Sequence, residues 1–274
     1  MKLALSLLAV ATVAPTLALT PEEAVQSAFE NLRMSTTAWV RLESEETVRN
    51  QQTTRVHDLF WMQGFDRDGQ LEIKVEIVEY ADGSPVRRTV ADGRILWDYD
   101  IRRNTYSATD YRGSGPEAHA GYASRALQGL ARIQDNRSAA LVRLLGEVWG
   151  GAASRFRPWV LTEANNRALV DGPAWMTDPM SPDQIIGPKF GESVAVWWSP
   201  GSNGTARRAI SFSMSVDDSG NRTLNGIHFR DRVSNDRTLT WTMTVQPSVL
   251  PASANFVFVP PASAKPIVSN RPGM

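Results

Sequence analysis

Three histidines are the residues best able to do acid–base or metal chemistry in this chain, and they stand far apart in the sequence. His57 and His228 fall in segments with strand-like alternation, and His119 stands near the start of a helical stretch. A metalloprotease or hydrolase site needs its residues at set spacing, and neither HExxH nor GxSxG occurs. We therefore predict no catalytic residue and no metal site, and expect each histidine to be a hydrogen-bonded strand residue or a surface residue.

Other groups of polar residues also have simpler structural explanations. Residues 66–69 (Asp-Arg-Asp-Gly) resemble the start of a calcium-binding loop, but its twelfth position is Ile77 where such loops carry Glu. Residues 113–115 (Gly-Ser-Gly) lack the lysine of a phosphate-binding loop. The three glutamates within 43–46 could pair as acid and base, although charges so close on a strand are typical of a solvated face or edge. These patterns do not predict an enzyme, and no cofactor is expected.

The composition excludes several classes of protein. The chain has 274 residues, with 29 Lys+Arg, 29 Asp+Glu and no Cys. Without cysteine there is no disulfide, thiol nucleophile, cysteine-bound metal or lipid anchor on a cysteine. Nucleic-acid binding proteins usually carry a net positive charge or a basic stripe, and here the signs are balanced and interspersed. With 42% hydrophobic and 21% charged residues, the chain should bury a sizeable core.

The elements that must position any site are one N-terminal helix and many strands. Thr20 as N-cap, Pro21 at the first helical position and apolar residues at helical spacing predict a helix over 21–34. Asp-Gly pairs at 82–83 and 92–93 predict tight hairpins of an antiparallel meander. Alternation of apolar and polar residues predicts strands near 38–42, 59–63, 71–77, 86–91, 95–99, 105–111, 194–198, 210–216, 227–229, 239–245 and 256–259.

The clearest strands, 210–216 and 239–245, are apolar on one side and rich in Ser or Thr on the other. A sheet with one solvated face must cover its other face. The available covers are the helix at 21–34 and a helical insert at about 116–150, where leucines recur at helical spacing. Residues 158–191, with five prolines, predict long irregular loops with one short strand.

Residues 1–18 have the pattern of a secretory signal. Lys2 supplies the positive start, an apolar run of 12 residues ends at Pro15, and Ala18 suits the cleavage position. The run is too short to span a membrane, which needs about 20 residues. We predict export with cleavage after Ala18, then a single domain over 19–262 and a mobile tail over 263–274. The exported protein is expected to be monomeric.

The segment Ala91–Asp100, followed by Asn104-Thr105-Tyr106, resembles the "DGkxlWxYdp…xqv" hairpin of LolA, the bacterial periplasmic carrier of lipoproteins, and its relatives. Other segments match in the same order: the helix from Pro21 and its following strand, Asp58–Trp61 against "DLWV", Ser215–Gly220 with Ile227–Phe229 against the late hairpin, and Phe256–Pro261 against the closing "FxFxPP". The resemblance spans most of the mature chain.

The resemblance implies a mainly β (α+β) fold: an unclosed, strongly curved antiparallel half-barrel of about eleven strands with a helical lid. The family carries the acyl chains of lipoproteins between membranes in its apolar cavity, without catalysis. For this chain it implies a periplasmic lipid-binding role in outer-membrane biogenesis. The implied partners are acyl chains of lipoproteins or lipids, with membrane-bound donor and acceptor proteins.

The resemblance and the alternation together predict which residues line the cavity, with plain core packing as the alternative for each. The expected lining residues are Val40, Leu42, Leu59, Trp61, Ile73, Val75, Phe212, Met214, Leu239, Trp241 and Met243, and the expected lid residues are Leu127, Leu130, Leu144 and Leu145. The family holds its lid closed with an arginine just after "DLWV", and Gln63 aligns with it here. An amide donates more weakly than a guanidinium, so Gln63 is at most a weaker lid latch.

Two other hypotheses stay open. The first is a non-transporting module of the same fold that senses envelope stress or binds a protein partner, with a filled cavity. Trp39 and Phe60, on the face opposite the cavity, would be exposed and free for partner contacts. The second is a secreted enzyme with a polar cleft, for which the sequence supplies no convergent titratable groups.

Overall fold

The computed structural model describes residues 19–65, 67, 69, 71–110, 166–179, 181, 183–199, 206–234 and 237–267. The expected signal segment, the expected helical insert with its four lid leucines, and His119 therefore lie outside the described residues. No helix in the described ranges is both long and apolar enough to cross a membrane.

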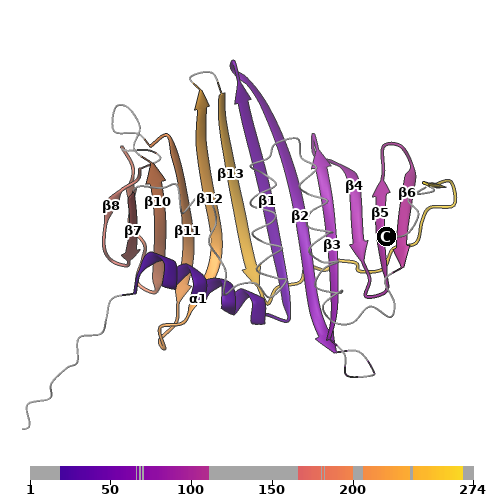
Figure 1. The fold of residues 1–274 in the computed structure, drawn as a ribbon, viewed down its shortest axis with the longest axis horizontal. Coiled ribbons are helices and arrows are strands. Elements are labelled where there is room, and N and C mark those ends of the chain that lie inside the picture. The colour runs from indigo at the N-terminus through magenta and orange to yellow at the C-terminus, as the bar shows by residue number, and fades with distance from the viewer. Residues whose placement is uncertain are drawn as a thin grey trace, which may run out of the picture.

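One helix and fourteen strands make up the described part of the chain (Figure 1). The elements are α1 (Pro21–Met34), β1 (Thr37–Val48), β2 (Gln51–Phe65), β3 (Leu71–Ala81), β4 (Ser84–Ala91), β5 (Ile95–Asp100), β6 (Thr105–Asp110), β7 (Asn166–Asp171), β8 (Met176–Thr177), β9 (Ile185–Ile186), β10 (Glu192–Ser199), β11 (Arg208–Val216), β12 (Arg222–Ser234), β13 (Arg237–Pro247) and β14 (Lys265–Pro266).

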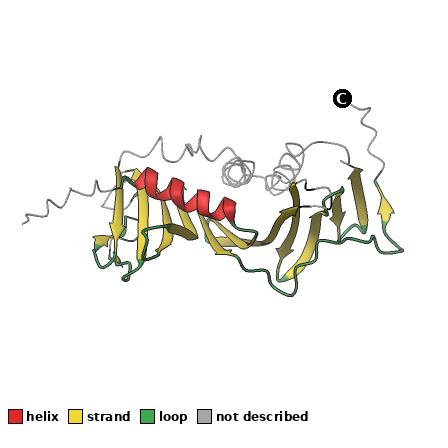
Figure 2. Ribbon diagram, turned by 90° about the horizontal axis from the view of Figure 1, so that it is seen from below, coloured by secondary structure: helices red, strands yellow, loops and turns green. Residues whose placement is uncertain are grey.

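Twelve of these strands form one large sheet, and β8 and β9 form a small separate pair. The strand order is β14-β6-β5-β4-β3-β2-β1-β13-β12-β11-β10-β7, so the meanders before and after the middle of the chain join where β1 pairs with β13. All neighbours in the large sheet are antiparallel except β14 and β6. The edge strands β7 and β14 do not pair with each other, and the sheet is bowed (Figure 2). The expected curved, unclosed, mainly β fold is confirmed.

Helix α1 begins as the sequence predicts. The Thr20 hydroxyl accepts a hydrogen bond from the Glu23 backbone N–H (3.3 Å), and the Glu23 carboxylate accepts from the Thr20 backbone N–H (2.8 Å). This capping box satisfies two backbone donors that a helix start otherwise leaves free. The helix lies on one face of the sheet (Figure 2), against β12, β10 and β7, and we name this face the inner face.

The hairpin of β1 and β2 is longer than the expected strands at 38–42 and 59–63. Its strands pair continuously from Thr37 opposite Met62 to Val48 opposite Gln51. Arg49 and Asn50 form the turn with positive φ values of 47° and 66°, as a two-residue hairpin requires. The apolar–polar alternation that predicted these strands covers only part of each strand. The outer part of the hairpin is largely exposed on both faces, so its residues need not alternate.

The C-terminal segment corrects two expectations. Residues 256–259, expected as a strand, have no regular secondary structure and form no ladder with the sheet. They cross the face opposite α1, here named the outer face (Figure 2), and Phe258 packs against Trp97 and Tyr99 at ring-centroid distances of 5.6 and 5.4 Å. Residues 263–267, expected to be part of a mobile tail, are bound to the sheet edge: β14 pairs with β6, and Asn104 Nδ2 donates to the Ser263 carbonyl (3.0 Å). We call residues 255–267 the C-terminal strap.

The outer face is less open than expected. Phe60, expected to be exposed, is only 5% exposed, and Trp39 is half-buried with its indole N–H donating to Asp58 Oδ1 (3.4 Å). Phe60 shares a row with Glu76, the residue that accepts the Asn255 backbone N–H at the start of the C-terminal strap. Period-two alternation could not show that a distant segment crosses this face.

Candidate functional site

The inner face of the large sheet is a continuous apolar surface. Directly paired residues of antiparallel strands point to the same face, so the register defines rows of side chains across the strands. Val40 on β1, for example, lies between Leu59 on β2 and Val245 on β13. Leu59 in turn pairs with Ile77 on β3. These rows join the inner face of both meanders into one buried layer.

Ten of the eleven expected lining residues have described side chains, and all ten lie on the inner face. None is more than 5% exposed: Val40, Leu42, Leu59, Trp61, Val75, Phe212, Met214, Leu239, Trp241 and Met243. The backbone of Ile73 lies in β3 opposite Gln63, but its side chain is outside the described set. The structure thus brings these residues together, and contact with a ligand stays a prediction.

Helix α1 covers the β7–β12 half of the inner face. Its Phe29 is fully buried and meets Phe212 edge-on at a centroid distance of 6.1 Å. Phe212 also meets Trp197 of β10 edge-on at 5.5 Å. Edge-to-face pairs add to the free energy gained by burying the rings. This half is therefore packed like an ordinary protein core by side chains of the chain itself.

Charged residues replace apolar ones at one end of the inner face. Arg237 Nε donates to Glu46 Oε1 (2.6 Å), and Arg208 Nε donates to Asp231 Oδ2 (3.2 Å). Further along the same end, Arg55 Nη1 lies 3.9 Å from Glu79 Oε1, and Arg87 forms an ion pair with Asp98. We call these four ion pairs the charged rim. An amphiphile on this face would meet apolar side chains first and charges of both signs at the rim.

His57 lies next to the charged rim on the inner face and departs from the expectation of a hydrogen-bonded histidine. It is 1% exposed, and neither ring nitrogen has a hydrogen-bond partner in the described structure. Burial, with a smaller contribution from the Arg55 charge, lowers the pKa of His57 from 6.5 to about 4. By contrast, His228 Nδ1 lies 3.1 Å from Thr242 Oγ1, as expected for a satisfied strand histidine.

The buried neutral His57 predicts a loss of stability in acid. Above pH 6.5 the ring is neutral in both states, whereas between 6.5 and about 4 only the unfolded chain takes up the proton. The free energy of unfolding should therefore fall as the pH drops through this window, by about 3 kcal/mol in total. Urea unfolding near pH 7.5 and near pH 4.5 checks this. The decline should be clearly shallower in His57→Leu, and equal declines in both proteins would contradict the assignment.

Gln63, the expected lid latch, is bound at the junction of α1 and β1. Its Nε2 donates to the Ser35 carbonyl (2.9 Å), and its backbone N–H donates to the Thr36 carbonyl (2.8 Å). Gln63 therefore fixes the end of β2 against the chain that leaves the helix. A contact with the expected lid concerns residues outside the described ranges, so the latch stays a prediction.

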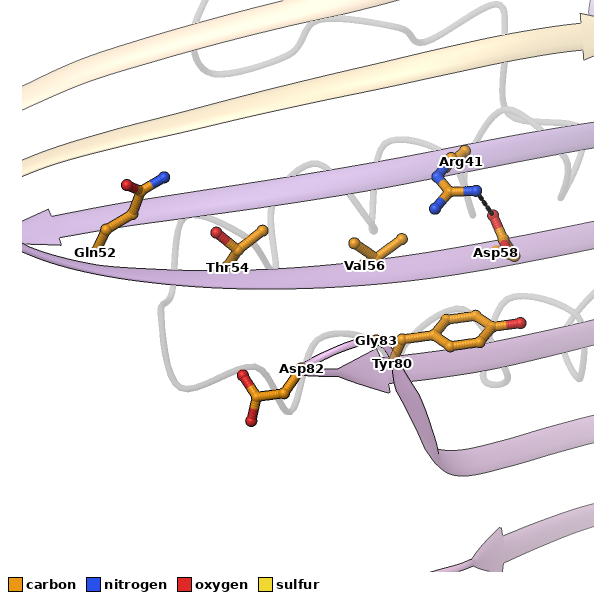
Figure 3. A pocket seen from close by; sticks show the side chains of 8 residues that line it. All are labelled: Arg41, Gln52, Thr54, Val56, Asp58, Tyr80, Asp82 and Gly83. Atoms are coloured by element: carbon orange, nitrogen blue, oxygen red, sulfur yellow. Dashed lines mark ion pairs between the residues drawn. The ribbon is translucent and has the colours of Figure 1, made fainter.

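A polar groove of about 520 Å³ lies on the outer face, away from the expected site (Figure 3). Its lining comes from β1, β2, the end of β3 and the β3–β4 turn: Arg41, Gln52, Thr54, Val56, Asp58, Tyr80, Asp82 and Gly83. Arg41 Nη1 lies 3.7 Å from Asp58 Oδ1, so these charges balance within the groove. Burial, together with the nearby Asp58 carboxylate, raises the pKa of Tyr80, so its phenol stays protonated. In the described residues no group of three or more His, Asp or Glu is placed to hold a metal ion.

No family model and no curated protein matches the chain. Solved structures do match it at low identity. LprF of Mycobacterium bovis is 9% identical with a TM-score of 0.36, over 87% of this chain and 97% of that one. A DUF1329 family protein of Desulfovibrio piger is 10% identical with a TM-score of 0.38, over 85% and 94%.

A third match is a LolA superfamily protein of Nitrosomonas europaea, 12% identical with a TM-score of 0.32, over 85% of this chain and 96% of that one. This is the family that the sequence motifs resemble.

Proposed function

We propose that the chain is an exported, non-enzymatic carrier that holds acyl chains of lipoproteins or lipids on the inner face of its half-barrel and moves them between membranes. The observation that carries this proposal is the continuous apolar inner face of an unclosed sheet, bordered by charges at one end. On this proposal the chain works in the periplasm as a monomer, with membrane-bound donor and acceptor proteins. A single domain that begins at residue 19 and includes the C-terminal strap, and the lid at about 116–150, belong to the same proposal.

Burial of hydrocarbon supplies enough free energy for such a role. Each buried CH₂ contributes about 0.8 kcal/mol, so a chain of roughly 15 carbons contributes on the order of 10 kcal/mol before the cost of ordering it. The β1–β3 part of the inner face is apolar over Val40, Leu59 and Ile77, and the main contacts of α1 lie elsewhere, on β12, β10 and β7. We place the acyl chain on this part.

One observation favours the second candidate, a non-transporting sensor or interaction module. The β7–β12 half of the inner face is already filled by α1 and by large side chains such as Trp197 and Phe212. A module with a filled cavity would need no ligand. The two candidates therefore differ in one measurable property, which is stoichiometric lipid binding by the mature protein.

Native mass spectrometry with lipid extraction, on mature protein purified from the exported fraction, tests the proposal. We expect an adduct of one acylated molecule per chain, or uptake of an added dipalmitoyl lipopeptide. Leu59→Lys should weaken this binding at least about tenfold, because an ammonium on the β1–β3 part makes contact with hydrocarbon unfavourable. Leu59 lies between Val40 and Ile77 in this part.

The matched control is Val257→Lys, at a residue of the C-terminal strap that is 64% exposed. It introduces the same charge away from the inner face and should leave lipid binding unchanged. Wild-type protein that stays unliganded with added lipopeptide would refute the carrier proposal and favour the interaction module.

A further inference from the structure

The inner-face side chains of β2 change from apolar to charged over three successive positions, Leu59, His57 and Arg55. Leu59 is 2% exposed, and Arg55, four residues earlier on the same face, forms the ion pair with Glu79. His57 stands between them. The same change occurs on β3, where Ile77 precedes Glu79, and the register aligns both changes in neighbouring rows. An apolar-to-polar border therefore crosses these strands at the level of His57.

The side chains around His57 leave its ring without a polar partner in the described structure. Its paired neighbours are Leu42 on β1 and Glu79 on β3, and Glu79 is engaged with Arg55. A neutral imidazole has one N–H donor and one acceptor nitrogen, and leaving them buried without partners is unfavourable. Since burial lowers the pKa of His57 to about 4, the ring is neutral at neutral pH and keeps that donor.

We propose that His57 donates a hydrogen bond to the ester carbonyl at the head of an acyl chain bound on the inner face. This inference rests on the proposed carrier function and deepens it. In an acylglycerol the ester joins the hydrocarbon to the polar head, just as His57 separates Leu59 from Arg55. An ester carbonyl only accepts hydrogen bonds, which matches an N–H donor that has no partner in the described structure. The hydrocarbon then lies over Leu59 and Ile77, and the head faces the charged rim.

The test compares two lipids that differ only in their ester carbonyls. Dioctanoyl phosphatidylcholine carries two ester carbonyls, and its dioctyl ether analogue carries none. Isothermal titration calorimetry of the mature protein at neutral pH should show the diester binding about 3- to 10-fold more tightly, the range for one neutral hydrogen bond. His57→Leu should abolish this preference while still binding both lipids. His57→Gln, which keeps an N–H donor, should retain part of it.

Leu59→Met is the matched control, because it alters the neighbouring inner-face residue without changing a polar group. It should shift both affinities together and leave the ester preference intact. Equal affinity of the wild-type protein for diester and diether would refute the carbonyl contact and leave the carrier function standing. A preference that persists in His57→Leu would also refute it. If neither lipid nor a dipalmitoyl lipopeptide binds, both the carrier function and this inference are wrong.

The ester could belong to a free glycerolipid or to the diacylglyceryl group of a lipoprotein. Titration of the same variants with the dipalmitoyl lipopeptide separates these sources. If the loss caused by His57→Leu is larger for the lipopeptide, the subsite serves the lipoprotein. If the loss is larger for phosphatidylcholine, the subsite serves the free lipid. No loss with either ligand overturns the proposal.

Discussion

Phe29→Ala is expected to lower the free energy of unfolding by about 3–5 kcal/mol, which is a large share of the stability of a typical domain. Phe29 is fully buried, and its ring meets Phe212 at 6.1 Å, edge-on. Truncation removes the buried ring, the aromatic contact and the packing that attaches α1 to the inner face. Urea unfolding followed by tryptophan fluorescence measures the change, because Trp197 lies in the same cluster.

The control for this prediction is Glu30→Ala, next to Phe29 but on the exposed side of α1. Glu30 accepts a hydrogen bond from Gln26 Nε2 (3.1 Å), so its loss should change stability by no more than about 0.5 kcal/mol. A Phe29→Ala variant that loses less than about 1 kcal/mol would mean that α1 contributes little to the fold. In that case α1 itself, and not only an insert, would be a movable cover.

Arg88→Met is expected to destabilise the protein by about 3 kcal/mol and to free the start of the C-terminal strap. The Glu76 side chain is 4% exposed, and Arg88 Nε donates to its Oε1 at 2.7 Å. Arg88 Nη2 also donates to the Asn255 carbonyl (2.8 Å), and Glu76 Oε2 accepts the Asn255 backbone N–H (2.6 Å). Removing the guanidinium leaves a buried carboxylate without its main counter-charge, which costs more than the pair contributes when intact.

A double variant separates the charge from the packing. Glu76→Gln combined with Arg88→Met removes both charges, and the amide can still accept the Asn255 N–H. It should therefore recover a substantial part of the stability lost in Arg88→Met alone. Hydrogen exchange at Asn255 and its neighbours should quicken in the single variant and slow again in the double variant. Unchanged exchange in Arg88→Met would show that Phe258 on Trp97 and Tyr99 holds the strap without these hydrogen bonds.

Local sequence signals predicted the elements whose causes are themselves local. The capping residues at Thr20 and Glu23 placed the start of α1, and the Asp82–Gly83 turn has the positive φ values of 52° and 74° that its residues favour. Alternation identified the apolar face of the strands, because a side chain's face is fixed by its position along its own strand. All ten described lining residues were predicted in this way, although their contact with lipid is untested.

The same signals failed where a distant segment sets the environment. Phe60 was expected to be exposed, but it is buried on the face that the C-terminal strap crosses. The outer half of the β1–β2 hairpin was missed because it is largely exposed and carries little apolar alternation. His57 was expected to be hydrogen-bonded, and its isolation follows from the neighbours that pairing gives it, Leu42 and Glu79.

The sequence by itself therefore determined the helix start, the tight turns, the strand faces and the resemblance to a lipoprotein-carrier family. Only the tertiary structure decided that β1 pairs with β13, so that two meanders form one inner face. It also decided where that face changes from apolar to charged, and that His57 lies at this border. The physical reason is that burial and hydrogen bonding of a side chain depend on neighbours from other strands, whereas period, capping and turn preference depend only on adjacent residues.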